Sequence, residues 1–113
     1  MFILGVPVIV NTTEAVTGRF VVVTWEPPLD GACPTVGYTL YYRKVMSLGR
    51  KTNWHSIAVN RNYTTYTLQL NCRKEYDVAV TSRSAYKESN FGDSIIWNFK
   101  TGGGDVFLYC GLK

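Results

Sequence analysis

The stretch Val21-Val22-Val23-Thr24-Trp25-Glu26-Pro27-Pro28 indicates most clearly how this chain folds. Successive side chains of a β-strand point to opposite faces, so Val21, Val23 and Trp25 share one apolar face. The paired prolines end the strand because proline cannot donate a hydrogen bond to a neighbouring strand. We therefore predict a strand over Arg19–Glu26 with this face buried.

The same β-like pattern continues on both sides of this stretch. Val, Ile, Thr, Tyr, Phe and Trp dominate, and no window has the i, i+3, i+4, i+7 spacing of an amphipathic helix. Short runs separated by turn residues are typical of a sandwich or a barrel. The other predicted strands are Pro7–Thr12, Gly37–Lys44, Trp54–Val59, Thr64–Leu70, Glu75–Ser82 and Ser94–Lys100. In the last of these, Ile95, Trp97 and Phe99 are expected on one side and Ile96 on the other.

Length and composition limit the class of protein. The chain has 113 residues, which suits one domain, and it is 46% hydrophobic and 18% charged, which argues against a disordered or membrane-spanning chain. The apolar stretch Phe2–Val10 is interrupted by Gly5 and Pro7 and is far shorter than the roughly 20 residues of a spanning helix. It also lacks the basic residue and cleavage site of a complete signal peptide. We expect no membrane insertion by this segment.

The chain resembles a fibronectin type III domain in several spaced segments, over about residues 6–101. The matching segments are Val21–Pro28, Gly37-Tyr38-Thr39-Leu40-Tyr41-Tyr42-Arg43, Tyr66-Thr67-Leu68-Gln69-Leu70 and Tyr76-Asp77-Val78-Ala79-Val80. The resemblance implies an all-β fold, a seven-stranded antiparallel β-sandwich of the immunoglobulin-like type. It implies a structural core that includes Trp25, Tyr38, Leu70 and Tyr76. The expected organisation is a linker at 1–6, the domain at 7–101, and a glycine-rich exit and tail at 102–113.

The spacing from Leu70 to Tyr76 resembles the family's tyrosine corner, in which the tyrosine hydroxyl bonds back to the backbone just upstream. A phenol buried beside a tight turn must find an acceptor, and Tyr76 is the candidate. The chain departs from the family pattern at Cys72, where proline is usual, and at Trp97, where a small or polar residue is more common.

No catalytic constellation is present in the sequence. The single histidine, His55, has no evident nucleophile or orienting partner, and it is interpreted as a partly exposed strand residue. There is no glycine-rich phosphate loop, CxxC motif or histidine pair. We therefore expect no enzyme activity, no cofactor and no metal site.

The three cysteines cannot all pair within the chain. The family topology places Cys33 at one pole, and Cys72 with the end of the last strand at the other. It thus implies a Cys72–Cys110 disulfide, with free thiols as the alternative. Cys33 could instead pair with a preceding unit of a longer chain.

Two glycosylation sequons favour an extracellular or cell-surface location. They are Asn11-Thr12-Thr13 and Asn62-Tyr63-Thr64, and both lie near predicted strand ends, where a glycan on Asn11 or Asn62 would reach solvent. Sequons also occur by chance, so unused sites are the alternative.

Basic residues are concentrated in the middle of the chain. Between Asp30 and Glu75 there is no acidic residue, but there are seven basic ones. All except Arg61 should gather at one pole of the fold, namely Arg43, Lys44, Arg50, Lys51, Arg73 and Lys74. Such a pole attracts polyanions such as sulfated glycans, or anionic lipid headgroups. The alternatives are a solvated face offset by acids elsewhere, or a docking surface for a following domain.

The loops at the other pole are candidates for protein recognition, because a rigid sandwich displays them. They carry Leu29, Asp30, Tyr86 and Phe91, and aromatic residues often dominate interface energies. Alternatively, Tyr86 and Phe91 simply pack over the end of the sandwich or against a neighbouring module. Nucleic acid is not expected as a partner, since most aromatic residues are needed inside.

These observations predict a non-catalytic extracellular adhesion or receptor module. It would serve as a spacer and a protein–protein interaction domain, binding protein partners or neighbouring domains of a larger multidomain protein. A polyanion-binding module acting through the basic pole is the second hypothesis, and an intracellular scaffold domain is the third.

Overall fold

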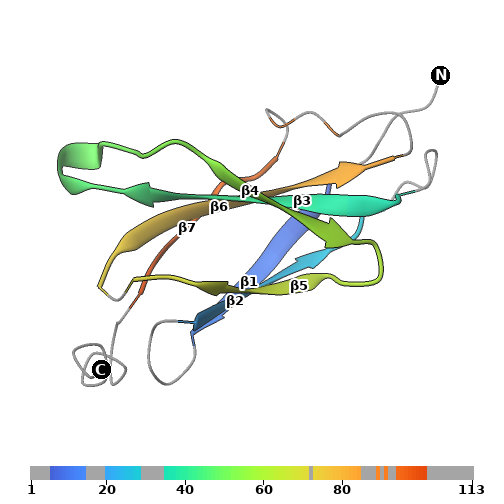
Figure 1. Cartoon of the computed structure of the whole chain (residues 1–113), viewed down its shortest axis with the longest axis horizontal. Helices are drawn as coiled ribbons and strands as arrows, with labels where there is room; N and C mark the ends of the chain where they lie inside the picture. Colours follow the sequence, from blue (N-terminus) through green and yellow to red (C-terminus); the bar gives the residue numbers. More distant parts are fainter. Residues whose placement is uncertain are drawn as a thin grey trace.

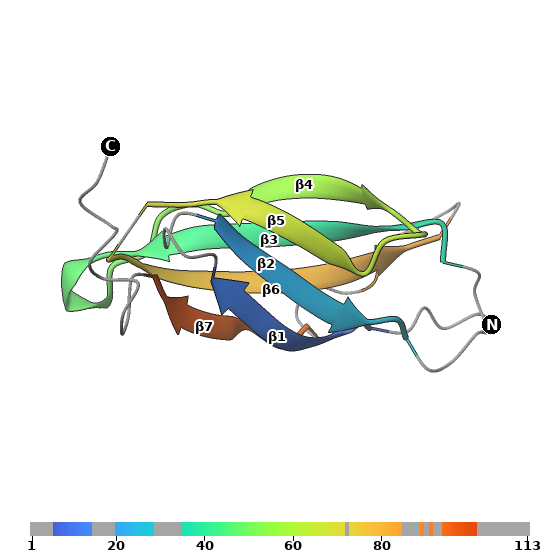
Figure 2. The ribbon, with the colours of Figure 1, turned by 90° about the horizontal axis from the view of Figure 1, so that it is seen from below.

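The computed structural model describes residues 6–14, 20–28, 35–71, 73–84, 89, 91 and 94–101. Its strands are β1 (Val8–Glu14), β2 (Phe20–Glu26), β3 (Gly37–Val45), β4 (His55–Asn60), β5 (Thr65–Gln69), β6 (Glu75–Arg83) and β7 (Trp97–Lys100), with a short 3₁₀ turn η1 (Ser47–Gly49). They form two antiparallel sheets, β1-β2-β5 and β4-β3-β6-β7, which lie face to face (Figures 1 and 2). The predicted seven-stranded sandwich is therefore confirmed.

The core lies between the two sheets and contains the four residues that the family resemblance implies. Trp25, Tyr38, Leu70 and Tyr76 are each at most 7% exposed, and Trp25 contacts Tyr38 edge-on with ring centroids 5.5 Å apart. Fully burying one large apolar side chain contributes roughly 1.5 to 3 kcal/mol. Alternation along the strands thus supplies most of the contact between the sheets.

The strand predicted over Ser94–Lys100 is shorter than expected. The Ser94 hydroxyl donates to the Val80 carbonyl of β6 at 3.0 Å, and β7 begins only at Trp97, which pairs with Val78. Ile95 is 55% exposed, so the prediction that it shares the inward face of Trp97 and Phe99 is wrong. The hydrogen bond from the Ser94 side chain thus takes the place of the next backbone hydrogen bonds between β6 and β7.

The tyrosine corner is present, with the hydrogen bond in the opposite sense to the one predicted. The Asn71 backbone N–H donates to the Tyr76 hydroxyl at 3.0 Å, so the phenol accepts. The Tyr76 ring also stacks on Phe99 at 6.0 Å. Burial raises the pKa of Tyr76, although the hydrogen bond from Asn71 works in the other direction. The corner joins the end of β5 to the start of β6.

Strand β3 runs the length of the sandwich and defines its two ends. Gly37 pairs with Asn60 and Arg83 at one end, and Val45 pairs with Glu75 at the other. A Cβ atom at position 37 would lie 3.0 Å from the Val59 carbonyl oxygen and would displace the Arg83 guanidinium, so the site is crowded for any larger residue. We call the Val45 end the basic end, because it carries the six predicted basic residues.

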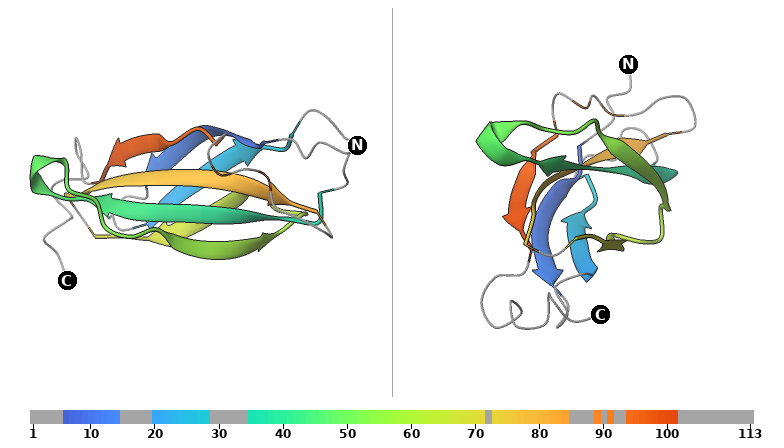
Figure 3. Two further views of the ribbon diagram at one scale, coloured as in Figure 1. Left: turned by 90° about the horizontal axis from the view of Figure 1, so that it is seen from above. Right: turned by 60° about the vertical axis from the view of Figure 1, so that its left-hand side comes forward.

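The side of the sandwich beside β1 and β7 is closed by a contact between the sheets. Figure 3 shows β7 and β1 next to each other, and the Trp97 indole N–H donates to the Thr12 hydroxyl at 3.2 Å. Trp97, unusual for the family, thus joins the two sheets.

Candidate binding surface at the basic end

A hairpin tip projects from the basic end between β3 and β4 (Figure 1). An isolated bridge between Val45 and Lys51 and a hydrogen bond from the Met46 N–H to the Arg50 carbonyl hold its base. The turn itself needs left-handed backbone, with φ of 74° at Gly49 and 62° at Leu48. Glycine accepts this conformation, whereas leucine is strained there by about 1 to 2 kcal/mol.

Leu48 is 100% exposed, so burial of its side chain does not offset this strain. Met46, two residues earlier, is 51% exposed. The projecting turn therefore presents two large apolar side chains to solvent. The sequence indicates this surface only weakly. Gly49 predicts a turn, but no residue pattern predicts that the turn projects from the sandwich.

Two of the predicted basic residues are bound to a buried carboxylate. The Asp77 side chain lies 3.0 Å from Arg43 Nε and 3.6 Å from Lys51 Nζ, and Asp77 is only 3% exposed. The Asn98 amide donates to both Asp77 and Glu75. Acids on β6 therefore offset part of the basic end, as one of the sequence-based alternatives anticipates.

The pKa of Asp77 reflects these partners. Burial by itself would raise it, but the hydrogen bonds from Asn98 and Arg43, with the charges of Lys51 and Arg43, lower it below its ordinary range. The carboxylate is thus ionised in the folded protein at neutral pH and holds both cations in place.

Aromatic rings lie beside these charged side chains on the outer face of the four-stranded sheet. Tyr41 and Trp54 both meet Phe91 edge-on, with centroids 4.8 and 5.3 Å away, and the Arg43 guanidinium lies 4.1 Å above the Trp54 ring. We call Tyr41, Arg43, Trp54, Asp77 and Phe91 the outer-face layer. The contacts between the rings, and between the Arg43 guanidinium and Trp54, stabilise the fold.

Phe91 does not lie where the sequence predicted. We expected it at the pole opposite the basic end, but it packs on Tyr41, which pairs with Ala79 midway along β3. Ala79 and Thr81, on the same outer face of β6, are completely buried. Alternation indicates which residues point outward from a sheet, but not which distant segment covers them.

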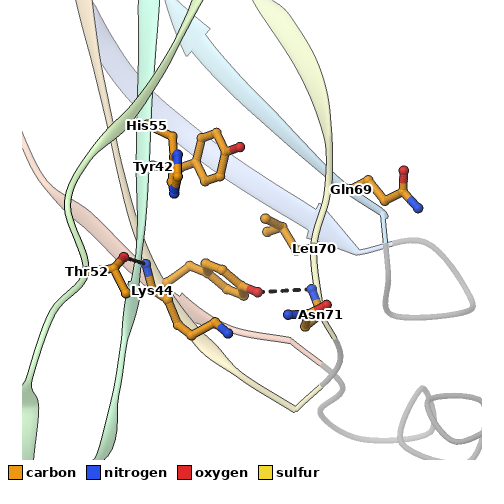
Figure 4. A pocket seen from close by; sticks show the side chains of 8 residues that line it. Tyr42, Lys44, Thr52, His55, Gln69, Leu70 and Asn71 are labelled. Carbon is orange, nitrogen blue, oxygen red and sulfur yellow. Dashed lines mark hydrogen bonds between the residues drawn. The ribbon is translucent and has the colours of Figure 1, made fainter.

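The remaining basic residues occupy two settings. Lys44 points to the other side of β3 and lines a hollow of about 290 Å³ between the sheets (Figure 4). The hollow's other lining residues are Tyr42, Thr52, His55, Gln69, Leu70, Asn71 and Tyr76. Arg50, Arg73 and Lys74 are exposed at the surface. Among the described residues, no ion pair involves Arg50 or Lys74.

The other predicted site residues are placed only in part. Asn11 is exposed on β1, with its amide donating to Thr13 Oγ1 at 3.0 Å, and Asn62 is exposed in the turn between β4 and β5. Leu29, Asp30, Tyr86, Cys33, Cys72 and Cys110 lie outside the described residues.

Comparison with known proteins decides the family. The model of the fibronectin type III domain matches residues 7–95. The chain belongs to this family. Fibronectin type III domains are generally non-catalytic modules for protein interaction or spacing in multidomain proteins. No curated protein matches the chain.

Three solved structures similar to this fibronectin type III domain support the fold alone, since each of the three is under 25% identical. A myokine structure has 24% identity and a TM-score of 0.64, covering 87% of this chain and 97% of its own. The FN5 domain of Drosophila Lar has 18% identity and a TM-score of 0.63, covering 90% and 100%. The twitchin kinase region of C. elegans has 20% identity and a TM-score of 0.65, covering 93% of this chain but 18% of its own.

Two further findings concern the described part of the domain only. It contains no group of three or more His, Cys, Asp or Glu side chains placed to hold a metal ion. It also contains no helix long and apolar enough to cross a membrane.

Proposed function

We propose that this domain is an extracellular adhesion or receptor module that acts as a rigid spacer and a protein-binding unit in a larger multidomain protein. One observation supports the spacer role most strongly, namely that the polypeptide enters and leaves at opposite ends. Val8 pairs with Glu26 beside the Gly37 end, whereas the Thr101 N–H donates to the Lys74 carbonyl at the basic end. Neighbouring domains attached there would be held apart by the length of β3.

A distance measurement tests the spacer role. Spin labels attached through non-natural amino acids at Val8 and Lys100, both exposed, report the separation of the two ends. The nine residues of β3 span roughly 25 to 30 Å, so we expect one narrow distribution near that value. A broad distribution would show that the domain is too flexible to fix the separation of its neighbours.

The extracellular location is tested by a peptide map under non-reducing conditions, on protein secreted from a eukaryotic host. We expect glycan on Asn62, which lies in an exposed turn, or on Asn11, together with a Cys72–Cys110 linked peptide. Bare asparagines and three free thiols would contradict this location and favour the intracellular scaffold hypothesis.

Binding of sulfated glycans at the basic end is the second candidate function. Arg50 and Lys74 favour it, because both are exposed and available to a polyanion. Lys51, by contrast, is already bound to Asp77. If it is correct, the domain is retained on heparin, retention weakens steeply with salt, and Arg50→Glu with Lys74→Glu abolishes it. Retention equal to that of a neutral sandwich would exclude this function.

A further inference from the structure

The geometry points to peripheral docking of the basic end on an anionic phospholipid bilayer, with the hairpin tip at Leu48 dipping into the interface. The contact is made by side chains of a turn and is no membrane span. It goes beyond the spacer role and does not depend on it, since the distance between the two ends is measured separately.

The apolar part of this surface is the tip. Leu48 is completely exposed and Met46 is 51% exposed, on a turn that projects past the ends of the strands (Figures 1 and 2). Electrostatic attraction to a polyanion explains neither side chain. An interfacial site, by contrast, combines apolar residues that enter the acyl boundary with basic residues that stay among the headgroups.

The charged part of the surface lies directly behind the tip. Arg50 follows it in sequence, and Lys51 is exposed as well as bridged to Asp77. Lys74 lies on the adjoining turn before β6, which pairs with the end of β3. Each basic side chain at the surface of an anionic bilayer strengthens binding roughly fivefold. Glu75, which pairs with Val45 at the base of the turn, and Asp77, which is bound to Lys51, offset part of this charge.

The small size of the tip favours a bilayer over a protein partner. A stable protein interface buries about 800 Å² on each side, which a turn of five residues, Met46–Arg50, does not supply. A bilayer needs only the tip, because the headgroups surround the basic residues from every direction. The sandwich would then stand on its basic end with the opposite loops facing away from the lipid.

The test is co-sedimentation of the domain with vesicles of phosphatidylcholine and phosphatidylserine, compared with phosphatidylcholine alone. We expect binding to the mixed vesicles only. Leu48→Gly should lower the partition coefficient roughly tenfold or more, because it removes a leucine that would be buried. The variant should fold well, since glycine accepts the left-handed backbone at this position. Arg50→Gln should weaken binding several-fold, most strongly at low salt.

Two further variants distinguish the possible outcomes. Tyr63→Ser removes a 62% exposed aromatic ring at the opposite end and should leave vesicle binding unchanged. Leu48→Trp should show a blue-shifted emission with mixed vesicles only. Absence of wild-type binding to mixed vesicles would overturn the proposal. Equal binding of Leu48→Gly and wild type would also overturn it, because charge attraction alone would then explain the binding. Equal loss of heparin and vesicle binding in Leu48→Gly would overturn it as well, because it would indicate an effect on the fold.

Discussion

The two faces of the four-stranded sheet are buried to a similar degree but by different means. On the inner face, Leu40, Val78 and Val80 pack on the other sheet and are at most 1% exposed. On the outer face, Asp77, Ala79 and Thr81 are at most 3% exposed, although no second sheet covers them in the described part of the chain. Instead, aromatic rings, a guanidinium and a carboxylate form a layer of their own. Part of the charge and aromatic content of this chain is therefore structural, and surface composition alone overstates what remains for binding.

The largest effect is expected from a comparison of two tryptophans, one in the core between the sheets and one in the outer-face layer. Trp25→Ala leaves a cavity between the sheets and should lower the free energy of unfolding by about 3 to 5 kcal/mol. Trp54→Ala removes ring contacts and the contact with Arg43, and should cost about 1 to 2 kcal/mol. Urea unfolding compares the two, and equal losses would mean that the outer-face layer is a full second core.

The buried carboxylate should come next. Asp77→Asn keeps the shape but leaves Arg43 and Lys51 without their counter-ion, so we expect a loss of about 2 to 4 kcal/mol. Thermal unfolding of the variant measures it. An unchanged midpoint would show that the ion pairs contribute nothing, as for many surface pairs.

The pH dependence of stability isolates the same group. Because folding lowers the pKa of Asp77, its contribution is complete above the ordinary carboxylate pKa near 3.8 and is lost as the pH falls through the lowered value. Wild type should therefore lose more stability than Asp77→Asn does on acidification below about pH 4. Parallel curves for the two proteins would exclude a lowered pKa.

A smaller effect, of opposite sign, is expected at Thr81. It is completely buried on the outer face, and within the described part of the chain its hydroxyl has no hydrogen-bond partner. Thr81→Val keeps the volume and removes the unpaired hydroxyl, so the free energy of unfolding should rise by about 1 kcal/mol. A decrease measured by urea unfolding would reveal a hydrogen bond at this hydroxyl.

The two faces also separate what could be predicted from the sequence. Alternation in β2, β3 and β6 determines the inner face, so Trp25, Tyr38 and Tyr76 were identified correctly. The basic end was predictable because the topology of the fibronectin type III family brings its loops to one pole. Its division into bound and unbound cations was not, since the contact of Arg43 with Asp77 spans 34 residues. The position of Phe91 could not be predicted either, because a local pattern carries no information about which distant segment covers a sheet.

The measurement that tests this account most directly is paired urea unfolding of Arg43→Gln and Arg50→Gln. The residues are seven positions apart and carry the same charge, but Arg43 lies in the outer-face layer and Arg50 at the exposed tip. We predict a loss of about 1 to 2 kcal/mol for Arg43→Gln and no measurable change for Arg50→Gln. Equal losses, or a larger loss at Arg50, would contradict the division between structural and available cations.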